Sequence, residues 1–201
     1  HNMIKFIDIN RSKPYKIFLD IYKTALSANQ KYIEAASISS FSKRYNEVRS
    51  RYVNIKYIKN DNWIFFTNYD SPKNEEFLNH KQISCIFFWN ELNIQIRLKA
   101  KIKKLSKTHS DNHFKERSIE KNALAICSNQ SREIASYASM IKKYNDVINS
   151  DLNLRKRPDH WGGYKFKPYY FEFWEGNNAR LNKRQVFKKK NKLWIESYLQ
   201  P

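Results

Sequence analysis

Strict alternation of apolar and polar side chains over residues 94–103 constrains the fold of this chain more than any other feature. The apolar positions are Ile94, Ile96, Leu98, Ala100 and Ile102, and the positions between them are Gln95, Arg97, Lys99, Lys101 and Lys103. Because successive side chains of a β-strand point to opposite faces, this pattern predicts a half-buried strand with a cationic outer face.

Periodicity elsewhere in the chain predicts further strands and four helices. The strands are expected at residues 33–39, 49–58, 63–67, 83–89, 169–174 and 185–198, with a hairpin turn at residues 59–62. The helices are expected at residues 14–29, 71–82, 107–122 and 130–148, the last turning Ile134, Tyr137, Ala138, Ile141 and Tyr144 inward. This order of elements predicts an α+β fold, an antiparallel β-barrel flanked by helices, in a single domain over residues 1–201.

The charge balance raises the question of an anionic partner. The chain has 38 Lys and Arg residues against 19 Asp and Glu residues, a formal net charge of +19. Such an excess favours nucleic acid, an acidic membrane or phosphorylated small molecules. Lysine carries most of the excess, however, and surplus lysine can also be ordinary solvated surface. Only cations at patterned positions therefore indicate a binding site.

The overall composition and the N-terminal residues exclude several classes of protein. A hydrophobic content of 41% and an aromatic content of 15% are too high for a disordered chain. No apolar run approaches the roughly 18 residues that span a bilayer, and polar residues interrupt any secretory signal, so a cytoplasmic protein is expected. His1 and Asn2 before Met3 resemble an expression scar, and residues 1–13 are expected to form a flexible arm.

Motifs of common catalytic centres are missing from the sequence. It contains no GxGxxG, P-loop, HExxH or GxSxG pattern, and its five histidines have no metal-ligand spacing. Cys85 and Cys127 lie in apolar stretches, which is typical of core cysteines in a reducing compartment. No metal site is predicted.

The C-terminal third carries the most specific pattern. Its motifs are Arg157–Tyr164 (RPDHWGGY), Phe171–Gly176 (FEFWEG), Arg180–Arg184 (RLNKR), Trp194 and Leu199–Pro201 (LQP). Together they closely resemble the C-terminal signature of the pyridoxamine 5′-phosphate oxidases, flavin enzymes of vitamin B6 metabolism. Upstream stretches resemble the same family in the same order, namely RYVNIK (51–56), FFTN (65–68), SPK (71–73), Gln95 and QSR (130–132).

The resemblance implies an FMN-binding split β-barrel that forms a homodimer, with one FMN at each end of the subunit interface. The implied FMN ligands are Arg51, Lys56, Phe66, Thr67, Lys73, Gln95, Gln130, Ser131, Trp174 and Arg184. The implied substrate ligands are Lys56, His113, Arg117, Lys121, Arg180 and Asn182, with Arg180 and Asn182 at the reacting centre. Taken singly, each has an ordinary alternative, such as a core Trp, a solvated cation or a helix-capping Ser. Their joint order favours the site.

Several positions depart from the family pattern. Pro72 stands where the family has an Arg that would bind the FMN phosphate, and Phe66 replaces a Tyr. On the substrate side, His113 replaces a Tyr and Lys121 a Ser, which keeps donors and adds cationic character. Asn182 replaces a His, and Asn cannot take up a proton near neutral pH.

The resemblance implies an FMN-dependent oxidase that converts pyridoxamine or pyridoxine 5′-phosphate to pyridoxal 5′-phosphate, with oxygen as acceptor and hydrogen peroxide as product. One alternative is a flavin oxidase of the same family acting on another aromatic substrate, as the phenazine-biosynthesis oxidases do. Another is a flavin-binding split-barrel protein without turnover. Nucleic-acid binding through the Arg97–Lys103 face and Lys188–Lys190 has no recognised motif behind it, so neither a nucleic-acid nor a membrane partner is expected.

Overall fold

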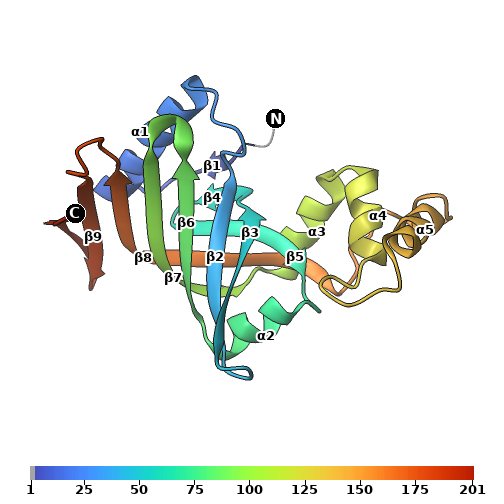
Figure 1. Ribbon diagram of the computed structural model, residues 1–201. Helices are drawn as coiled ribbons and strands as arrows, with labels where there is room; N and C mark the ends of the chain where they lie inside the picture. Colours follow the sequence, from blue (N-terminus) through green and yellow to red (C-terminus); the bar gives the residue numbers. More distant parts are fainter. Residues whose placement is uncertain (1–2) are drawn as a thin grey trace.

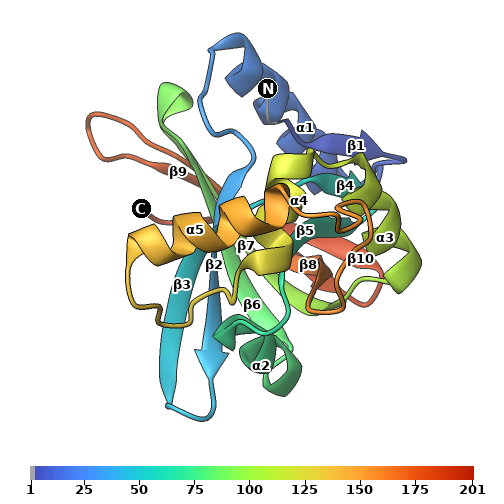
Figure 2. The same cartoon turned by 90° about the vertical axis from the view of Figure 1, so that its right-hand side faces the viewer.

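The structure is a computed structural model that describes residues 3–201 (Figures 1 and 2). The predicted expression scar, His1 and Asn2, lies outside the described residues. The strands are β1 (Lys5–Ile7), β2 (Ala35–Ser42), β3 (Glu47–Asn54), β4 (Tyr57–Lys59), β5 (Asn62–Asn68), β6 (Gln82–Trp89), β7 (Ile94–Lys104), β8 (Trp161–Glu175), β9 (Lys183–Lys190) and β10 (Leu193–Leu199). The α-helices are α1 (Lys13–Ser27), α2 (Pro72–Asn79), α3 (Lys107–Glu116), α4 (Ile119–Cys127) and α5 (Tyr137–Ile148), and a 3₁₀ turn spans Asn90–Leu92.

The strands form one curved sheet in the order β1-β4-β5-β8-β7-β6-β2-β3, and β9 and β10 extend it from β8. The β1–β4 pair is parallel, and all other pairs are antiparallel. The 15-residue strand β8 organises the sheet. Its first part pairs with β5, its last part pairs with β9, and β7 runs along most of its length. The predicted α+β barrel flanked by helices is confirmed.

The alternation at residues 94–103 has the predicted consequence. In β7 the apolar side chains from Ile96 to Ile102 are buried, and the lysines between them are exposed. Helix α1, which begins with Pro14 in its first turn, closes the core over β5 and β6. Phe18 of α1 meets Trp63 of β5 with ring centroids 4.7 Å apart in an edge-on contact. Aromatic side chains thus fill the centre of the barrel.

Residues 4–7, within the expected flexible arm, pack against the barrel, which corrects the prediction for this part of the arm. Lys5–Ile7 form strand β1, which pairs with Tyr57–Lys59. Ile4 is buried, and its backbone N–H donates to the hydroxyl of Tyr22 at 2.9 Å. An apolar residue and a free strand edge together anchor a segment whose mixed composition gave no strand signal.

Two predicted helices also differ from the observed ones. The expected helix at 107–122 is broken into α3 and α4 because Arg117 is extended and Ser118 caps α4. The helix expected at 130–148 begins only at Tyr137, and α5 has no buried residue. Ile134, Tyr137 and Ile141, expected to face inward, are exposed. In Figures 1 and 2, α5 lies beside α4, away from the barrel.

Candidate active site

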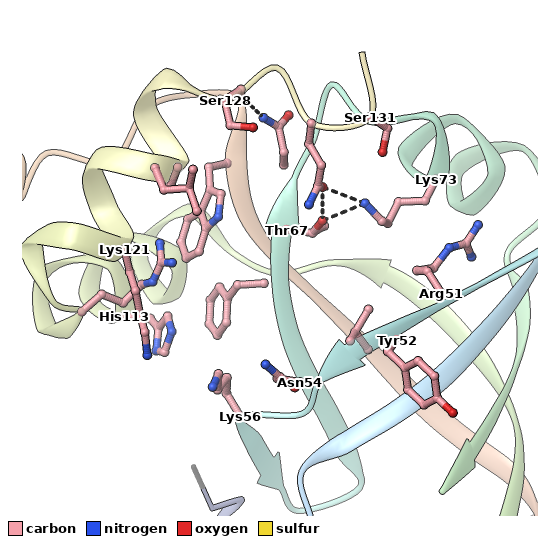
Figure 3. A pocket seen from close by; sticks show the side chains of 18 of the residues that line it. Arg51, Tyr52, Asn54, Lys56, Thr67, Lys73, His113, Lys121, Ser128 and Ser131 are labelled. Carbon is pink, nitrogen blue, oxygen red and sulfur yellow. Dashed lines mark hydrogen bonds between the residues drawn. The ribbon is translucent and has the colours of Figure 1, made fainter. Parts of the chain in front are cut away.

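A cleft of about 1250 Å³ opens between β3, β5, α2 and the α3–α4 pair (Figure 3). Ten of the predicted ligand residues line it, namely Arg51, Lys56, Phe66, Thr67, Lys73, His113, Arg117, Lys121, Gln130 and Ser131. The cleft has two cationic ends. The Lys73 end consists of Arg51, Thr67, Lys73, Gln130 and Ser131, and the Arg117 end consists of Lys56, His113, Arg117 and Lys121.

At the Lys73 end, a buried ammonium group is surrounded by neutral oxygens. Nζ of Lys73 donates to Oγ1 of Thr67 at 3.0 Å, to Oγ of Ser71 at 2.8 Å and to Oε1 of Gln130 at 2.8 Å. Burial lowers the pKa of Lys73 to about 8. The neighbouring oxygens satisfy the N–H groups but leave the positive charge without an anion in contact, which suits an incoming phosphate.

Arg51 approaches the Lys73 end from β3 with its guanidinium held by α2 and β2. Nη2 of Arg51 contacts Oε1 of Glu76 at 3.0 Å, and Nη1 donates to Oγ of Ser40 at 2.6 Å. Glu76 is buried, and it also contacts Arg49 at 3.4 Å. No sequence pattern indicated a role for Glu76, although it holds a cation that was predicted to bind phosphate.

The proline at the start of α2 changes the Lys73 end as the sequence suggested. Pro72 occupies the first turn of the helix, and it also lines the cleft, where it supplies no donor. Ser71 stands at the cap position but makes no side-chain capping bond. Its hydroxyl instead donates to the Asn68 carbonyl at 2.9 Å and accepts from Lys73. Ser71 is therefore the N-cap residue of α2, as expected, but its hydroxyl contacts Lys73 and does not cap the helix.

The Arg117 end gathers cations with few acidic partners. The guanidinium of Arg117 lies over the ring of Trp161, 4.3 Å from its centroid, and burial lowers the pKa of Arg117 to about 10. Its Nη1 is buried without a hydrogen-bond partner in the described chain. Burial lowers the pKa of Lys56, and the charges of Lys121 and Arg117 lower it further. An orphaned guanidinium donor among like charges is suited to an anion.

His113 forms the wall of the Arg117 end together with three aromatic rings. Its ring stacks on Phe66 with centroids 3.8 Å apart and planes 7° from parallel. Phe66 stacks in turn on Trp161 at 5.4 Å. Nδ1 of His113 lies 2.8 Å from the hydroxyl of Tyr57. No sequence pattern indicated a role for Tyr57, because it occupies an ordinary buried position on the short strand β4.

Five predicted residues lie outside the cleft, in what we call the β8–β9 cluster: Gln95, Trp174, Arg180, Asn182 and Arg184. Gln95 of β7 is opposite Trp174 of β8, which is opposite Arg184 of β9. Arg180 and Asn182 lie in the loop between β8 and β9, where Arg180 has a positive φ of 60°. One chain therefore separates the predicted ligands into two groups.

A buried carboxylate that the sequence did not single out holds the β8–β9 cluster together. Oε2 of Glu172 contacts Nε of Arg184 at 2.9 Å and Nη1 of Arg97 at 3.6 Å. Arg97 also donates from Nη2 to Oε1 of Gln95 at 3.1 Å. Burial alone would raise the pKa of Glu172, but the hydrogen bond from Arg184 and the charge of Arg97 outweigh it and lower that pKa. Glu172 lies within the FEFWEG motif, which was its only signal.

The donors at the Lys73 end fit the terminal phosphate of FMN. They combine a cation that lacks a contacting anion, Lys73, with the hydroxyls of Thr67 and Ser131 and the amide of Gln130. Within residues 3–201, no group of three or more His, Cys, Asp and Glu side chains could hold a metal ion. In the same range, no helix has the length and apolar character needed to cross a membrane.

Comparisons with known proteins agree on one family. A family model described as pyridoxamine 5′-phosphate oxidase matches residues 25–150, and one described as the pyridoxine 5′-phosphate oxidase C-terminal dimerisation region matches residues 161–201. The pyridoxine/pyridoxamine 5′-phosphate oxidase 1 of Hydrogenovibrio crunogenus is 35% identical, with 95% of this chain and 89% of that protein covered. The pyridoxine/pyridoxamine 5′-phosphate oxidase of Herminiimonas arsenicoxydans is 31% identical, with 94% and 89% covered.

Solved structures share the fold. PhzG from Burkholderia lata, crystallised with tetrahydrophenazine-1-carboxylic acid, has a TM-score of 0.86 at 23% identity, covering 94% of this chain and 93% of that one. A pyridoxamine 5′-phosphate oxidase-related, FMN-binding protein from Nostoc punctiforme has a TM-score of 0.78 at 9% identity, covering 94% and 99%. These likenesses confirm the predicted split barrel. On the family model, the curated relatives and the fold, the chain belongs to the pyridoxamine 5′-phosphate oxidase family of oxidoreductases.

Proposed function

We propose that this protein is an FMN-dependent oxidase of pyridoxine or pyridoxamine 5′-phosphate and works as a homodimer. The observation that carries the proposal is a single cleft with two separate cationic ends, one for the phosphate of each ligand. Family membership supports the reaction class, and the curated relatives are named for these two substrates. The chemistry that FMN supplies when bound is acceptance of a hydride from the substrate carbon bearing the alcohol or amine, with oxygen as final acceptor and hydrogen peroxide as product.

The Lys73 end would hold the FMN phosphate. Nζ of Lys73 already has three oxygens at hydrogen-bond distance, so the ammonium group is fixed in place before a ligand arrives. Ser131 would add a hydroxyl donor, and the Thr67 hydroxyl, which donates to Oε1 of Gln130 at 3.0 Å, would turn toward the phosphate. Arg51, kept in position by Glu76, would contribute a second positive charge. A prearranged donor set lowers the conformational cost of binding an anion.

The Arg117 end would hold the substrate phosphate. Arg117 has a buried Nη1 without a partner in the described residues, and Lys56 and Lys121 flank it. Bringing a dianion into this end would relieve the mutual repulsion of the three cations. The flat stack of His113, Phe66 and Trp161 would hold the walls of the end in place and limit the entry of water.

A partner subunit would complete the cleft with its β8–β9 cluster. Gln95, Trp174 and Arg184 are clustered on neighbouring strands yet lie outside the cleft of their own chain. The C-terminal region that contains most of this cluster matches a family model described as a dimerisation region. Arg180 and Asn182 would then meet the reacting part of the substrate, with Asn182 orienting a polar substituent by hydrogen bonding.

The test is to load the purified protein with FMN, remove free FMN, and add pyridoxine 5′-phosphate in air. We expect flavin absorption bands in the protein fraction, formation of pyridoxal 5′-phosphate and one peroxide per product. Arg117→Met should keep the flavin bands and raise the KM for pyridoxine 5′-phosphate by roughly ten- to a hundredfold, the loss expected for one charged hydrogen bond. Absence of flavin binding, or of product with flavin bound, would contradict the proposal.

A second candidate function is oxidation of a different aromatic substrate by the same site. Asn182 favours it, because the resemblance implies a His at this position, near the reacting centre. The distinguishing experiment compares kcat/KM for pyridoxine 5′-phosphate with that for phosphate-free aromatic acids in the wild type and in Asn182→His. A higher kcat/KM for an aromatic acid than for pyridoxine 5′-phosphate in the wild type, with the preference reversed in Asn182→His, would support this candidate.

A further inference from the structure

Tyr57 and His113 form a pair that separates two hollows. Both residues line the cleft at the Arg117 end, and both also line a smaller hollow beside α3 and β1. The hydroxyl of Tyr57 and Nδ1 of His113 are 2.8 Å apart, with the two rings edge-on at 84°. His113 is labelled in Figure 3 on the same side of the cleft as Lys56 and Lys121.

The position of the His113 ring is fixed on both sides. One face lies flat against Phe66 at a centroid distance of 3.8 Å, and the edge is held by Tyr57. Neither the hydroxyl of Tyr57 nor Nε2 of His113 has another hydrogen-bond partner within residues 3–201. The ring therefore has one nitrogen committed to Tyr57 and one free to meet a ligand.

A second proton on the ring is strongly disfavoured by its surroundings. Burial lowers the pKa of His113 to about 3, with further contributions from the charges of Arg117 and Lys56 and from His109 and Lys5. The cations among these groups come from the end of α3 (Arg117), the residue before β4 (Lys56) and β1 (Lys5), whereas β5 and β8 place the rings of Phe66 and Trp161 against His113. Glu116, an acid that lines both hollows, is exposed. His113 is thus a neutral imidazole at physiological pH, with one donor and one acceptor nitrogen.

The tautomer of His113 follows from the protonation state of Tyr57, its hydrogen-bond partner. Tyr57 is buried, and its pKa is raised by burial and by the charge of Glu116, so its hydroxyl keeps its proton. If Nδ1 of His113 carried the hydrogen, the hydroxyl proton of Tyr57 would have no acceptor among the described residues. If Nδ1 is the acceptor, the hydroxyl is satisfied and the ring hydrogen lies on Nε2.

We infer that Tyr57 is a positioning residue that holds His113 as a neutral imidazole with its hydrogen on Nε2, and that this N–H donates to the anionic group bound at the Arg117 end. The second clause rests on the proposed function, whereas the first concerns the protein alone. The Arg117 end then recognises an anion with fixed cations plus a neutral, directional donor. In the protein without ligand, the His113 donor is present across the physiological pH range.

The first test is a ¹H–¹⁵N correlation spectrum of the ¹⁵N-histidine-labelled protein, with the His113 signals assigned by their loss in His113→Gln. We expect an unprotonated Nδ1 and a protonated Nε2 that persist from pH 8 down to pH 5. Tyr57→Phe should shift the Nδ1 resonance or mix the tautomers, while Tyr32→Phe, at an exposed tyrosine away from the cleft, should leave the signals unchanged. An imidazolium pattern at pH 6, or the hydrogen on Nδ1, would overturn the inference whether or not the protein is an oxidase.

The second test measures the role of the donor in binding. In FMN-loaded protein, Tyr57→Phe should raise the KM for pyridoxine 5′-phosphate about three- to tenfold with kcat nearly unchanged, because the donor is displaced but not removed. His113→Gln, whose amide N–H can reach the Nε2 position, should retain more affinity than His113→Phe. Equal affinity in Gln and Phe variants would overturn the donor role while leaving the oxidase proposal intact.

Discussion

Lys73 illustrates how a single residue prepares the cleft for a ligand. Its three hydrogen bonds satisfy the donors of the ammonium group, but all three acceptors are neutral. Burial is therefore only partly offset, and the pKa of Lys73 falls from 10.5 to about 8. An amine with this pKa is charged at neutral pH and loses its charge in mildly alkaline solution.

The first prediction concerns the pH dependence of FMN binding and of stability. A bound phosphate dianion raises the pKa of Lys73, so FMN affinity should fall above pH 8, by up to about tenfold per pH unit. Without ligand, the free energy of unfolding should change with pH in the opposite direction and increase as the pH rises. Between pH 8 and 10.5 the unfolded chain binds more protons at this residue, so Lys73 should favour folding more as the pH rises. Flavin fluorescence quenching and urea unfolding measure the two effects.

Lys73→Met should weaken FMN binding at pH 7 and abolish the decline above pH 8. The matched control is Lys101→Met, which removes an exposed lysine from the outer face of β7 and should change neither property. A wild-type affinity that stays constant from pH 7 to 9.5 would show that Lys73 does not meet the phosphate.

At the scale of elements, the sequence predicted the strands better than the helices. The alternation at 94–103 predicted β7 within one residue, because a solvated face and a core face impose a strict period of two. The turn at residues 59–62 was likewise confirmed, with Asn60 at a positive φ of 52°. Strands expected at 49–58 and 185–198 are each divided into two, the second by a hairpin turn in which Asn191 has a positive φ of 57°.

Helix α5 was predicted from an amphipathic pattern. Its apolar face was expected to pack inward, but it is exposed in the single chain. The 3.6-residue period indicates that one face avoids water, but it does not tell whether the cover comes from the same chain. Ile141 and Tyr137 are 45% and 80% exposed in the single chain. A helical period alone therefore cannot tell whether such a face is covered within its own chain.

The second prediction concerns the pairing of β7, β8 and β9 through Glu172. Glu172→Gln removes the charge that Arg184 and Arg97 share, at a cost of roughly 1–3 kcal/mol in the free energy of unfolding, because the carboxylate is buried but both arginines are partly exposed. Since the pKa of Glu172 is lowered in the folded state, its contribution is present above pH 4.5 and is lost as the pH falls through the folded pKa.

Urea unfolding at pH 7 and at pH 3.5 tests this prediction. The difference between wild type and Glu172→Gln should be largest at pH 7 and should shrink in acid. Glu175→Gln, at the exposed end of β8, is the control and should have little effect at either pH. An undiminished difference in acid would mean that the variant acts through packing rather than through charge.

At the scale of the whole molecule, the exposed apolar side chains and the β8–β9 cluster both favour an arrangement in which two chains pack against each other. Val48 and Tyr52 of β3 and Leu193, Ile195 and Tyr198 of β10 are exposed on the strands at the ends of the sheet. Apolar side chains on such edges commonly mark an interface. The order of motifs in the sequence identified the candidate ligands, but not which of them lie in the cleft and which in the β8–β9 cluster. Gln95 and Trp174, for example, are brought together by strand pairing and not by proximity in the chain.

The last prediction tests whether two chains share one site. Lys73→Met damages the cleft and Arg184→Met damages the β8–β9 cluster, so each homodimer should have two defective sites. A mixed dimer contains one chain of each variant. If each site combines the cleft of one chain with the β8–β9 cluster of the other, one site carries both changes and the other carries neither. Random mixing should then restore about one quarter of wild-type FMN binding and activity. Mixing Lys73→Met with Thr67→Val, both in the cleft, should restore nothing. If subunits exchange, as differently tagged chains can show, and the first mixture still recovers no site, then the β8–β9 cluster serves its own chain and the shared-site arrangement is wrong.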